Sequence, residues 1–190
     1  EVAADSTSVS LRLGSTGSEG VLFDAIMLNA GTLAGYNLVE NYGFEDADTS
    51  MWTGVNLAAG DQIVSSGMIN GAKTTYMAGS ISAEKAFKQI IALNASETHT
   101  FAISFLGYAN ALPYKDQNEN YFGMRVKVNY SDGTYKWETF EANHEITSRQ
   151  HVSGILYLSD NDPATTKTIT SLEMCLTYAH NLGQAFFDDV

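Results

Sequence analysis

The sequence predicts an all-β protein built as an antiparallel β-sandwich. Several stretches alternate apolar and polar residues with a period of two, which is the pattern of half-buried strands. Turn signals such as Asp132-Gly133 separate these stretches, and only two prolines occur in the chain. No stretch has the periodicity of a long helix. Many short strands joined by turns are typical of sandwiches and barrels.

The clearest predicted strand covers residues 121–130, where apolar and polar side chains alternate without interruption. One face would carry Phe122, Met124, Val126, Val128 and Tyr130, and the other Gly123, Arg125, Lys127 and Asn129. Further strands are predicted at residues 100–107, 134–140, 152–158 and 169–178. Residues 86–93 also favour a strand, with a short helix as the alternative.

The turn after residue 130 predicts how two strands pair. Asp132-Gly133 is the strongest short signal for a two-residue hairpin turn. Such a turn would pair Val128 with Trp137 and Lys127 with Glu138. Trp137 would then lie on the apolar face, and we would not expect it to serve as an exposed ligand platform. Lys127 and Glu138 would form an opposite-charge pair on the other face.

The charge balance excludes two classes of partner. The 10 Lys and Arg residues stand against 22 Asp and Glu residues, a net charge of −12. This charge would repel nucleic acids and anionic membrane surfaces. No apolar run approaches the ~20 residues of a membrane span, so membrane insertion is not expected. The single cysteine, Cys175, excludes an intrachain disulfide and a cysteine-based zinc site, and we expect it to be buried.

A partial internal repeat indicates how the chain is organised. Residues 20–28, GVLFDAIML, are similar to residues 184–190, QAFFDDV, and both follow an alternating stretch and a glycine-containing turn. Residues 1–35 are therefore interpreted as the terminal strands of a preceding similar module. The alternative is that they are accessory strands packed on the main domain. Residues 36–190 would form a complete β-sandwich module.

Two motifs mark the ends of this module. It opens with YNLVENYGFED (residues 36–46), followed by Trp52, and closes with FFDDV (residues 186–190). Together they resemble jelly-roll carbohydrate-binding modules, which open with N-L-x-x-N-x-x-F-E and close with an aromatic-Phe-Asp-Asp-Val sequence. Residues 97–109, ETHTFAISFLGYA, resemble a central strand of the same family. The tandem arrangement resembles repeated modules of bacterial surface proteins, such as YD-repeat (RHS-type) proteins, and of multimodular glycoside hydrolases.

The resemblance implies a jelly-roll-like sandwich and a non-catalytic role. The module would bind a polysaccharide or other glycan by aromatic stacking and hydrogen bonding, within a multimodular protein that is secreted or held at the cell surface. Neighbouring modules of the same polypeptide would be further partners. The alternative is a structural spacer or adhesion module with no glycan ligand. A binding module should expose two or more coplanar aromatic rings beside polar groups, whereas a spacer should not.

The resemblance also implies a structural calcium ion near the paired chain ends. Glu45 and Asp188 would supply the hard oxygen ligands that Ca²⁺ prefers, with Asp61 as a weaker third candidate. The repeat favours Asp188 over its neighbour, because the first copy keeps an aspartate at that position and has Ala25 at the next. The alternative for these carboxylates is a solvated or turn-capping role.

Candidate ligand contacts are tyrosines interleaved with amides, and no catalytic motif is present. The candidates for glycan contact are Tyr108, Tyr114, Asn118, Tyr121, Arg125 and Tyr157. Four of them lie in the polar-aromatic stretch 108–121. No nucleophile elbow, zinc-protease helix motif or phosphate-binding loop occurs. We therefore expect a protein that is not an enzyme.

Overall fold

The computed structural model describes residues 37–65, 69–93, 100–111, 120–157 and 168–190. The chain divides into two units, Glu1–Gly35 and Tyr36–Val190, and all described residues belong to the second. The interpretation of residues 1–35 lies outside the described residues and stays a prediction.

The described residues form eight strands and no helix, so the predicted all-β class is confirmed. The strands are β1 (Thr53–Val55), β2 (Gln62–Ser65), β3 (Lys73–Ala92), β4 (Thr100–Ala109), β5 (Tyr121–Tyr130), β6 (Tyr135–Glu141), β7 (Gln150–Tyr157) and β8 (Ile169–Asp188). Residues 86–93 fall almost entirely within β3, which excludes the helical alternative. Within the described residues, no helix is long and apolar enough to cross a membrane.

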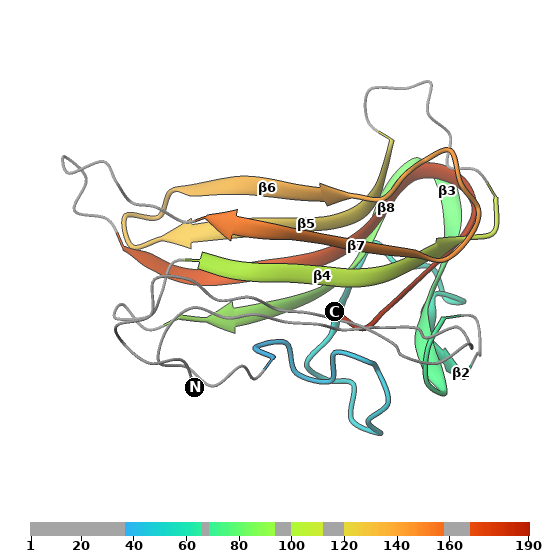
Figure 1. Cartoon of the computed structure of the whole chain (residues 1–190), viewed down its shortest axis with the longest axis horizontal. Helices are drawn as coiled ribbons and strands as arrows, with labels where there is room; N and C mark the ends of the chain where they lie inside the picture. Colours follow the sequence, from blue (N-terminus) through green and yellow to red (C-terminus); the bar gives the residue numbers. More distant parts are fainter. Residues whose placement is uncertain (1–36, 66–68, 94–99, 112–119, 158–167) are drawn as a thin grey trace, which may run out of the picture. The chain divides into compact units, whose positions relative to one another are not determined.

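The strands pair antiparallel in two layers. The first layer has the order β1, β3, β8, β5, β6, using residues 84–92 of β3 and 169–179 of β8. The second has the order β2, β3, β8, β4, β7, using the other ends of the two long strands. Figure 1 shows β5 and β6 side by side along the top of the view, with β4 and β7 side by side below them.

The two long strands bend where they pass from one layer to the other. The register between β3 and β8 shifts between Ala78 and Glu84, which marks the bend. Glycine is needed there, because a Cβ on Gly79 would lie 2.6 Å from the carbonyl oxygen of Asn181. On β8, Gly183 has φ +78°, a conformation that glycine adopts at little cost. These bends allow one pair of strands to build both walls of the sandwich.

The core lies between the layers and contains the predicted apolar face of β5 and the alternating apolar residues of β8. From these two strands it includes Phe122, Met124, Val126, Val128, Leu172, Met174, Leu176 and Tyr178. The period-two alternation therefore identifies the inward face of both strands correctly. Trp52 is buried, and so is Cys175, as expected for the cysteine.

The opening motif lies against the end of the chain. Asn37 donates from its amide nitrogen to the carbonyl oxygen of Val190 at 2.5 Å. The backbone nitrogen of Val190 donates to the carbonyl oxygen of Tyr42 at 3.1 Å. The two sequence motifs that mark the module's ends are therefore joined in space, as the resemblance implied.

Candidate ligand-binding face

The outward side of the first layer carries a continuous set of polar and aromatic side chains. Residues directly opposite one another on paired strands point to the same face of a sheet. One such row crosses four strands from Trp137 through Lys127 and Glu173 to Ile90. The next row runs from Thr139 through Arg125 and Cys175 to Lys88. We call the outward face formed by β3, β8, β5 and β6 the platform.

Ion pairs fix the charged side chains of the platform in place. The carboxylate of Glu173 accepts from Lys127 and from Lys88, each at 3.2 Å. Arg125 donates to Glu84 at 2.8 Å. Burial alone would raise the pKa of Glu173, but the hydrogen bonds from Lys127, Lys88 and Asn129 hold it below its usual value. The side chains of the two lysines and of Glu173 are half-buried, so solvent screens these pairs less than it screens fully exposed ones.

Two aromatic side chains stand exposed at the β6 side of the platform. Tyr135 and Trp137 lie two residues apart on β6 and are 58% and 48% exposed. They therefore point to the same face of the sheet. The ammonium group of Lys127 lies 4.5 Å from the centre of the Tyr135 ring, a cation–π contact that restrains both side chains. This edge of the platform therefore carries two exposed rings beside ion-paired side chains.

The exposure of Trp137 corrects the predicted hairpin register. The turn has three residues, 131–133: the nitrogen of Gly133 donates to the carbonyl oxygen of Tyr130 at 3.0 Å, and Gly133 has φ +81°. This is a type I turn followed by a left-handed glycine, not the two-residue turn expected from Asp-Gly. Trp137 therefore pairs with Lys127, not with Val128. A shift of one residue moves every side chain of β6 to the opposite face.

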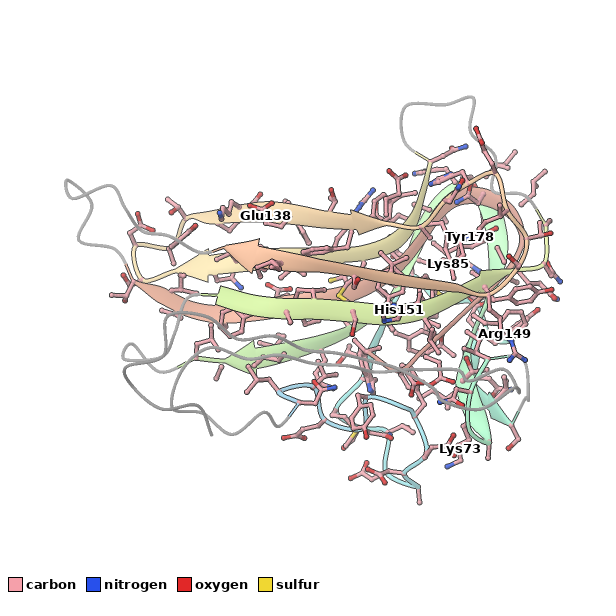
Figure 2. The ribbon with its side chains drawn as sticks, in the orientation of Figure 1. Lys73, Lys85, Glu138, Arg149, His151 and Tyr178 are labelled. Carbon is pink, nitrogen blue, oxygen red and sulfur yellow. The ribbon has the colours of Figure 1, made fainter. Side chains whose placement is uncertain are left out.

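The same shift places Glu138 on the opposite face of the hairpin from Lys127. Glu138 pairs with Val126 on the inward side, and its carboxylate lies 3.0 Å from Lys136. The predicted pair between Lys127 and Glu138 is therefore wrong. Figure 2 shows Glu138 on β6, at the edge of the first layer.

The structure brings only some of the candidate ligand residues together. Arg125 lies on the platform, and its guanidinium carbon is 4.2 Å from the centre of the Tyr121 ring. Tyr121 is itself buried there, and its hydroxyl donates to the carbonyl oxygen of Met124 at 2.7 Å. Tyr108 belongs to the second layer, where its ring contacts Phe186.

The remaining candidates are not on the described strands of the platform. Tyr157 pairs with Thr100 through the backbone in the second layer. Tyr114 and Asn118 lie outside the described residues. Sequence reasoning missed Tyr135 and Trp137 as contacts, although their spacing of two residues on one strand was a usable signal once the turn length was known.

The candidate calcium ligands lie close together near the joined ends of the chain. A Cβ on Gly43 would be 3.9 Å from a carboxylate oxygen of Asp188, 3.5 Å from one of Asp189, and 3.9 Å from Cγ of Glu45. Glu45 itself accepts from the backbone nitrogens of Ala72 and Lys73 at 2.6 and 2.9 Å. These two hydrogen bonds hold the pKa of Glu45 below its usual value.

Asp188 is the buried member of this cluster. It is only 1% exposed, and among the described residues its carboxylate accepts only from the backbone nitrogens of Asn70 and Asp189. Burial raises the pKa of Asp188 to about 7, and the negative charges of Asp189 and Glu45 add to the rise. A buried carboxylate with other carboxylates nearby is the donor chemistry that suits Ca²⁺.

Side chains alone do not complete a metal site in the part of the chain that the structure describes. There, no three His, Cys, Asp or Glu side chains are arranged to hold a metal ion together. Ca²⁺ takes six to eight oxygen ligands and accepts backbone carbonyls and water among them, so carbonyl oxygens would have to complete the set. Glu45 and Asp188 fit such a site as its carboxylate members.

Asp61, the third metal candidate, has a different role. Its carboxylate lies 2.7 Å from the ammonium of Lys85, and both side chains are buried. It also accepts from the backbone nitrogens of Ala58 and Ala78 at 2.6 and 2.8 Å. Its charge is therefore already neutralised by a cation of the chain, which leaves little reason for it to bind a metal ion.

Comparisons with known proteins identify similar folds rather than close relatives. No protein-family model matches the sequence, and no curated protein matches it. The structure is similar to a Clostridium thermocellum endo-1,4-β-D-xylanase fragment that joins a CBM22-1 module to a GH10 module, in complex with xylohexaose. The TM-score is 0.56 at 15% identity, over 83% of this chain and 28% of that one.

Two further solved structures extend the comparison. The CBM22-1 xylan-binding domain of a Paenibacillus barcinonensis xylanase gives a TM-score of 0.52 at 12% identity, over 83% of this chain and 94% of that one. The enzymatically active domain of tailspike protein 4 from bacteriophage CBA120 gives 0.55 at 11% identity, over 80% of this chain and 20% of that one. The matched part of the chain thus spans nearly the whole of that single CBM22-1 domain, but less than a third of each of the two longer chains. Its fold is the jelly-roll β-sandwich found in carbohydrate-binding modules.

Proposed function

We propose that this chain is a non-catalytic glycan-binding module of a secreted or cell-surface multimodular protein. The observation that carries the proposal is the exposure of Tyr135 and Trp137 on one face of β6, beside the ordered ion pairs of the platform. Exposed rings provide apolar surfaces for the faces of sugar rings. The neighbouring cations and carboxylates provide donors and acceptors for sugar hydroxyls.

The ordered state of the platform favours binding. Lys127 contacts both Glu173 and the Tyr135 ring, so its position is largely set before a ligand arrives. Groups that are already in place lose little conformational entropy on binding. A module of this kind acts by equilibrium binding: it raises the local concentration of its parent protein at a polysaccharide.

The similar solved structures support the same reading. One of them is a CBM22-1 xylan-binding domain, and in another a CBM22-1 module is joined to a GH10 module within a longer chain. By analogy, the present chain would be one module of a longer protein, with residues 1–35 as the end of a neighbouring module. This analogy concerns the fold and gives no particular sugar.

Affinity electrophoresis in native gels tests the proposal. The full chain is run through gels that contain soluble xylan, galactan, β-glucan or mannan. We expect at least one polysaccharide to retard the wild type, and Trp137→Ala to weaken that binding about 30-fold. This corresponds to the ~2 kcal/mol typical of a central aromatic contact.

Tyr42→Ala is the matched control, because Tyr42 is an aromatic residue that is 50% exposed but lies outside the platform. Its binding should equal that of the wild type. Equal losses in both variants, or none in Trp137→Ala, would contradict the platform assignment. No retardation by any polysaccharide in a broad panel would favour the alternative, a structural spacer or adhesion module.

We further propose a structural calcium ion at Glu45 and Asp188. Both residues come from the joined ends of the module, and the buried carboxylate of Asp188 receives only two backbone hydrogen bonds in the described part of the chain. When bound, Ca²⁺ would supply the positive charge that compensates these carboxylates. It would thereby tie the opening motif to β8.

Thermal unfolding with and without EDTA tests this second proposal. A ligand that binds only the folded state raises stability, by about 3 kcal/mol at a concentration 100 times its Kd. We expect EDTA to lower the Tm and added Ca²⁺, but not Mg²⁺, to restore it. Asp188→Asn should be insensitive to both treatments. An unchanged Tm in the wild type would remove calcium from the account.

A further inference from the structure

A pocket lies away from the platform, beside β2 and the segment 46–52. It is an open pocket of about 440 Å³, within the range of about 300–1,000 Å³ that is usual for small-molecule sites. Trp52, Phe87 and Ile63 contribute its apolar lining. Lys73 borders it, and Figure 2 shows Lys73 far from Glu138 on β6.

The wall of this pocket is held in a fixed shape by one asparagine. The backbone carbonyl oxygen of Asn41 accepts a hydrogen bond from the indole nitrogen of Trp52 at 3.2 Å. The side chain of Asn41 accepts from the nitrogen of Asp46 at 3.0 Å and donates to the carbonyl of Asp48 at 3.3 Å. The ring of Phe44 packs 5.0 Å from that of Trp52, centre to centre.

The backbone of the same segment is strained. Asn41 has φ +46°, which asparagine tolerates. Phe44 has φ +58°, which is a true outlier for a bulky residue. Backbone strain of this kind clusters at ligand-binding segments, where it holds groups ready for a ligand. The segment that leads into the pocket lining at Asp46 and Trp52 therefore has a strained backbone held by hydrogen bonds of Asn41.

The polar groups of the pocket are available and balanced in charge. In the described part of the chain, no hydrogen bond uses the side chains of Thr49 or Gln62, although both line the pocket. Asp46 and Lys73 contribute one charge of each sign. The Lys73 ammonium donates to two backbone carbonyls, those of Glu45 and Asp46, each at 2.9 Å, which leaves one N–H.

These features define the ligand chemistry. The pocket combines apolar side chains with hydrogen-bond donors and acceptors, and its two charges cancel. Such a lining suits a small neutral molecule with several hydroxyl groups. We infer that this pocket is a second ligand site, which takes a single sugar residue, either free or at the end of a glycan chain. The site is separate from the platform, so each can be tested without the other.

The two tryptophans of the chain make the test possible, because one lies in each site. Trp52 lines the pocket and Trp137 stands on the platform. Their indole N–H signals in a ¹H–¹⁵N correlation spectrum of the full chain are assigned with Trp52→Phe and Trp137→Phe. The probes are D-xylose, D-galactose, D-glucose and D-mannose in one arm, and xylohexaose and β-1,4-galactotriose in the other.

We expect at least one probe to shift the Trp52 signal saturably. A shift from the monosaccharides identifies free sugars as ligands, and a shift from the oligosaccharides alone identifies chain ends. Gln62→Ala should weaken that binding about fivefold, as expected for one lost hydrogen bond. Ser65→Ala, an exposed change on the same strand outside the pocket lining, should match the wild type.

Two results would overturn the inference. One is the absence of any saturable Trp52 shift across both sets of probes, whatever happens to Trp137. The other is a Trp52 shift whose midpoint is the same in Gln62→Ala as in the wild type, because the signal would then arise outside the pocket. A Trp137 shift alone would support the platform and reject the pocket.

Discussion

At the scale of single residues, two buried carboxylates occupy opposite electrostatic situations. Asp61 has a cationic partner, Lys85, at 2.7 Å, and accepts two backbone hydrogen bonds as well. Burial alone would raise the pKa of Asp61, but the hydrogen bond from Lys85 and those from the backbone hold it below its usual value. Asp188 is as buried, but among the described residues it has only backbone donors. The surroundings of Asp61 therefore favour the ionised carboxylate, whereas those of Asp188 disfavour it.

Breaking the buried pair of Asp61 and Lys85 should cause a large loss of stability. Lys85→Met leaves a buried carboxylate without its cation, which should cost about 3–5 kcal/mol of unfolding free energy. Lys88→Met on the same strand is the matched control. It should cost less than about 1 kcal/mol, because Glu173 keeps its contact with Lys127. Urea denaturation of both variants measures the difference, and similar losses in the two would refute the role given to Asp61.

Acid should weaken the stabilisation that the ionised carboxylate of Asp61 provides. Because the pKa of Asp61 is lower in the folded state than in the unfolded chain, its stabilisation is complete above about pH 4 and is lost as the pH falls below it.

Asp188 predicts the opposite pH dependence in metal-free protein. Its pKa is about 7 when folded, against about 3.9 when unfolded, so the folded state retains a proton that the unfolded state releases. Its ionisation therefore destabilises the fold increasingly as the pH rises from about 4 to 7. In EDTA, Asp188→Asn should be more stable than the wild type at pH 8, by at most about 4 kcal/mol. The gain should shrink towards pH 4, and a variant less stable than the wild type at pH 8 would contradict this account.

At the scale of elements, the hairpin of β5 and β6 decides which side chains reach the platform. Its three-residue turn depends on the left-handed conformation of Gly133 at φ +81°. No atom lies within 4 Å of a Cβ placed there, so a substitution meets only the backbone cost. Gly133→Ala should therefore lower stability by about 1–2 kcal/mol.

Gly60→Ala provides the control for this prediction. A Cβ at Gly60 also meets nothing within 4 Å, and its φ is not in the left-handed range. The control should be neutral or slightly stabilising. Thermal unfolding of the two variants compares them directly, and equal effects would mean that the turn conformation does not limit stability.

The elements also show what a sequence can predict. Residues 121–130 and 169–178 alternate so regularly that both the strands and their buried faces follow from period two alone. The continuation of β8 to Asp188 does not follow, because the bend at Gly183 breaks the alternation. The face of β6 also could not be fixed, since Asp-Gly suits both a two-residue turn and a three-residue turn ending in glycine.

At the scale of the whole molecule, the module offers two separated surfaces on one rigid sandwich. The platform uses the outward face of the first layer, and its ring-bearing edge is β6. The pocket uses segment 46–52 with β2 and β3. The closing contact between Asn37 and Val190 ties the segment before the pocket to the end of β8, which runs through both layers. A calcium ion at Glu45 and Asp188 would strengthen this closure without touching the platform.

The fluorescence of Trp137 tests the central claim most directly. In Trp52→Phe, Trp137 is the sole tryptophan, so its emission reports only on the platform. This variant is titrated with oligosaccharides of whichever polysaccharide retards the wild type. The account predicts a saturable change in emission, with a midpoint that matches the Kd from calorimetry and rises about 30-fold in the variant that also carries Lys127→Ala and Tyr135→Ala. Calorimetric binding that leaves the emission of Trp137 unchanged would show that glycans bind elsewhere.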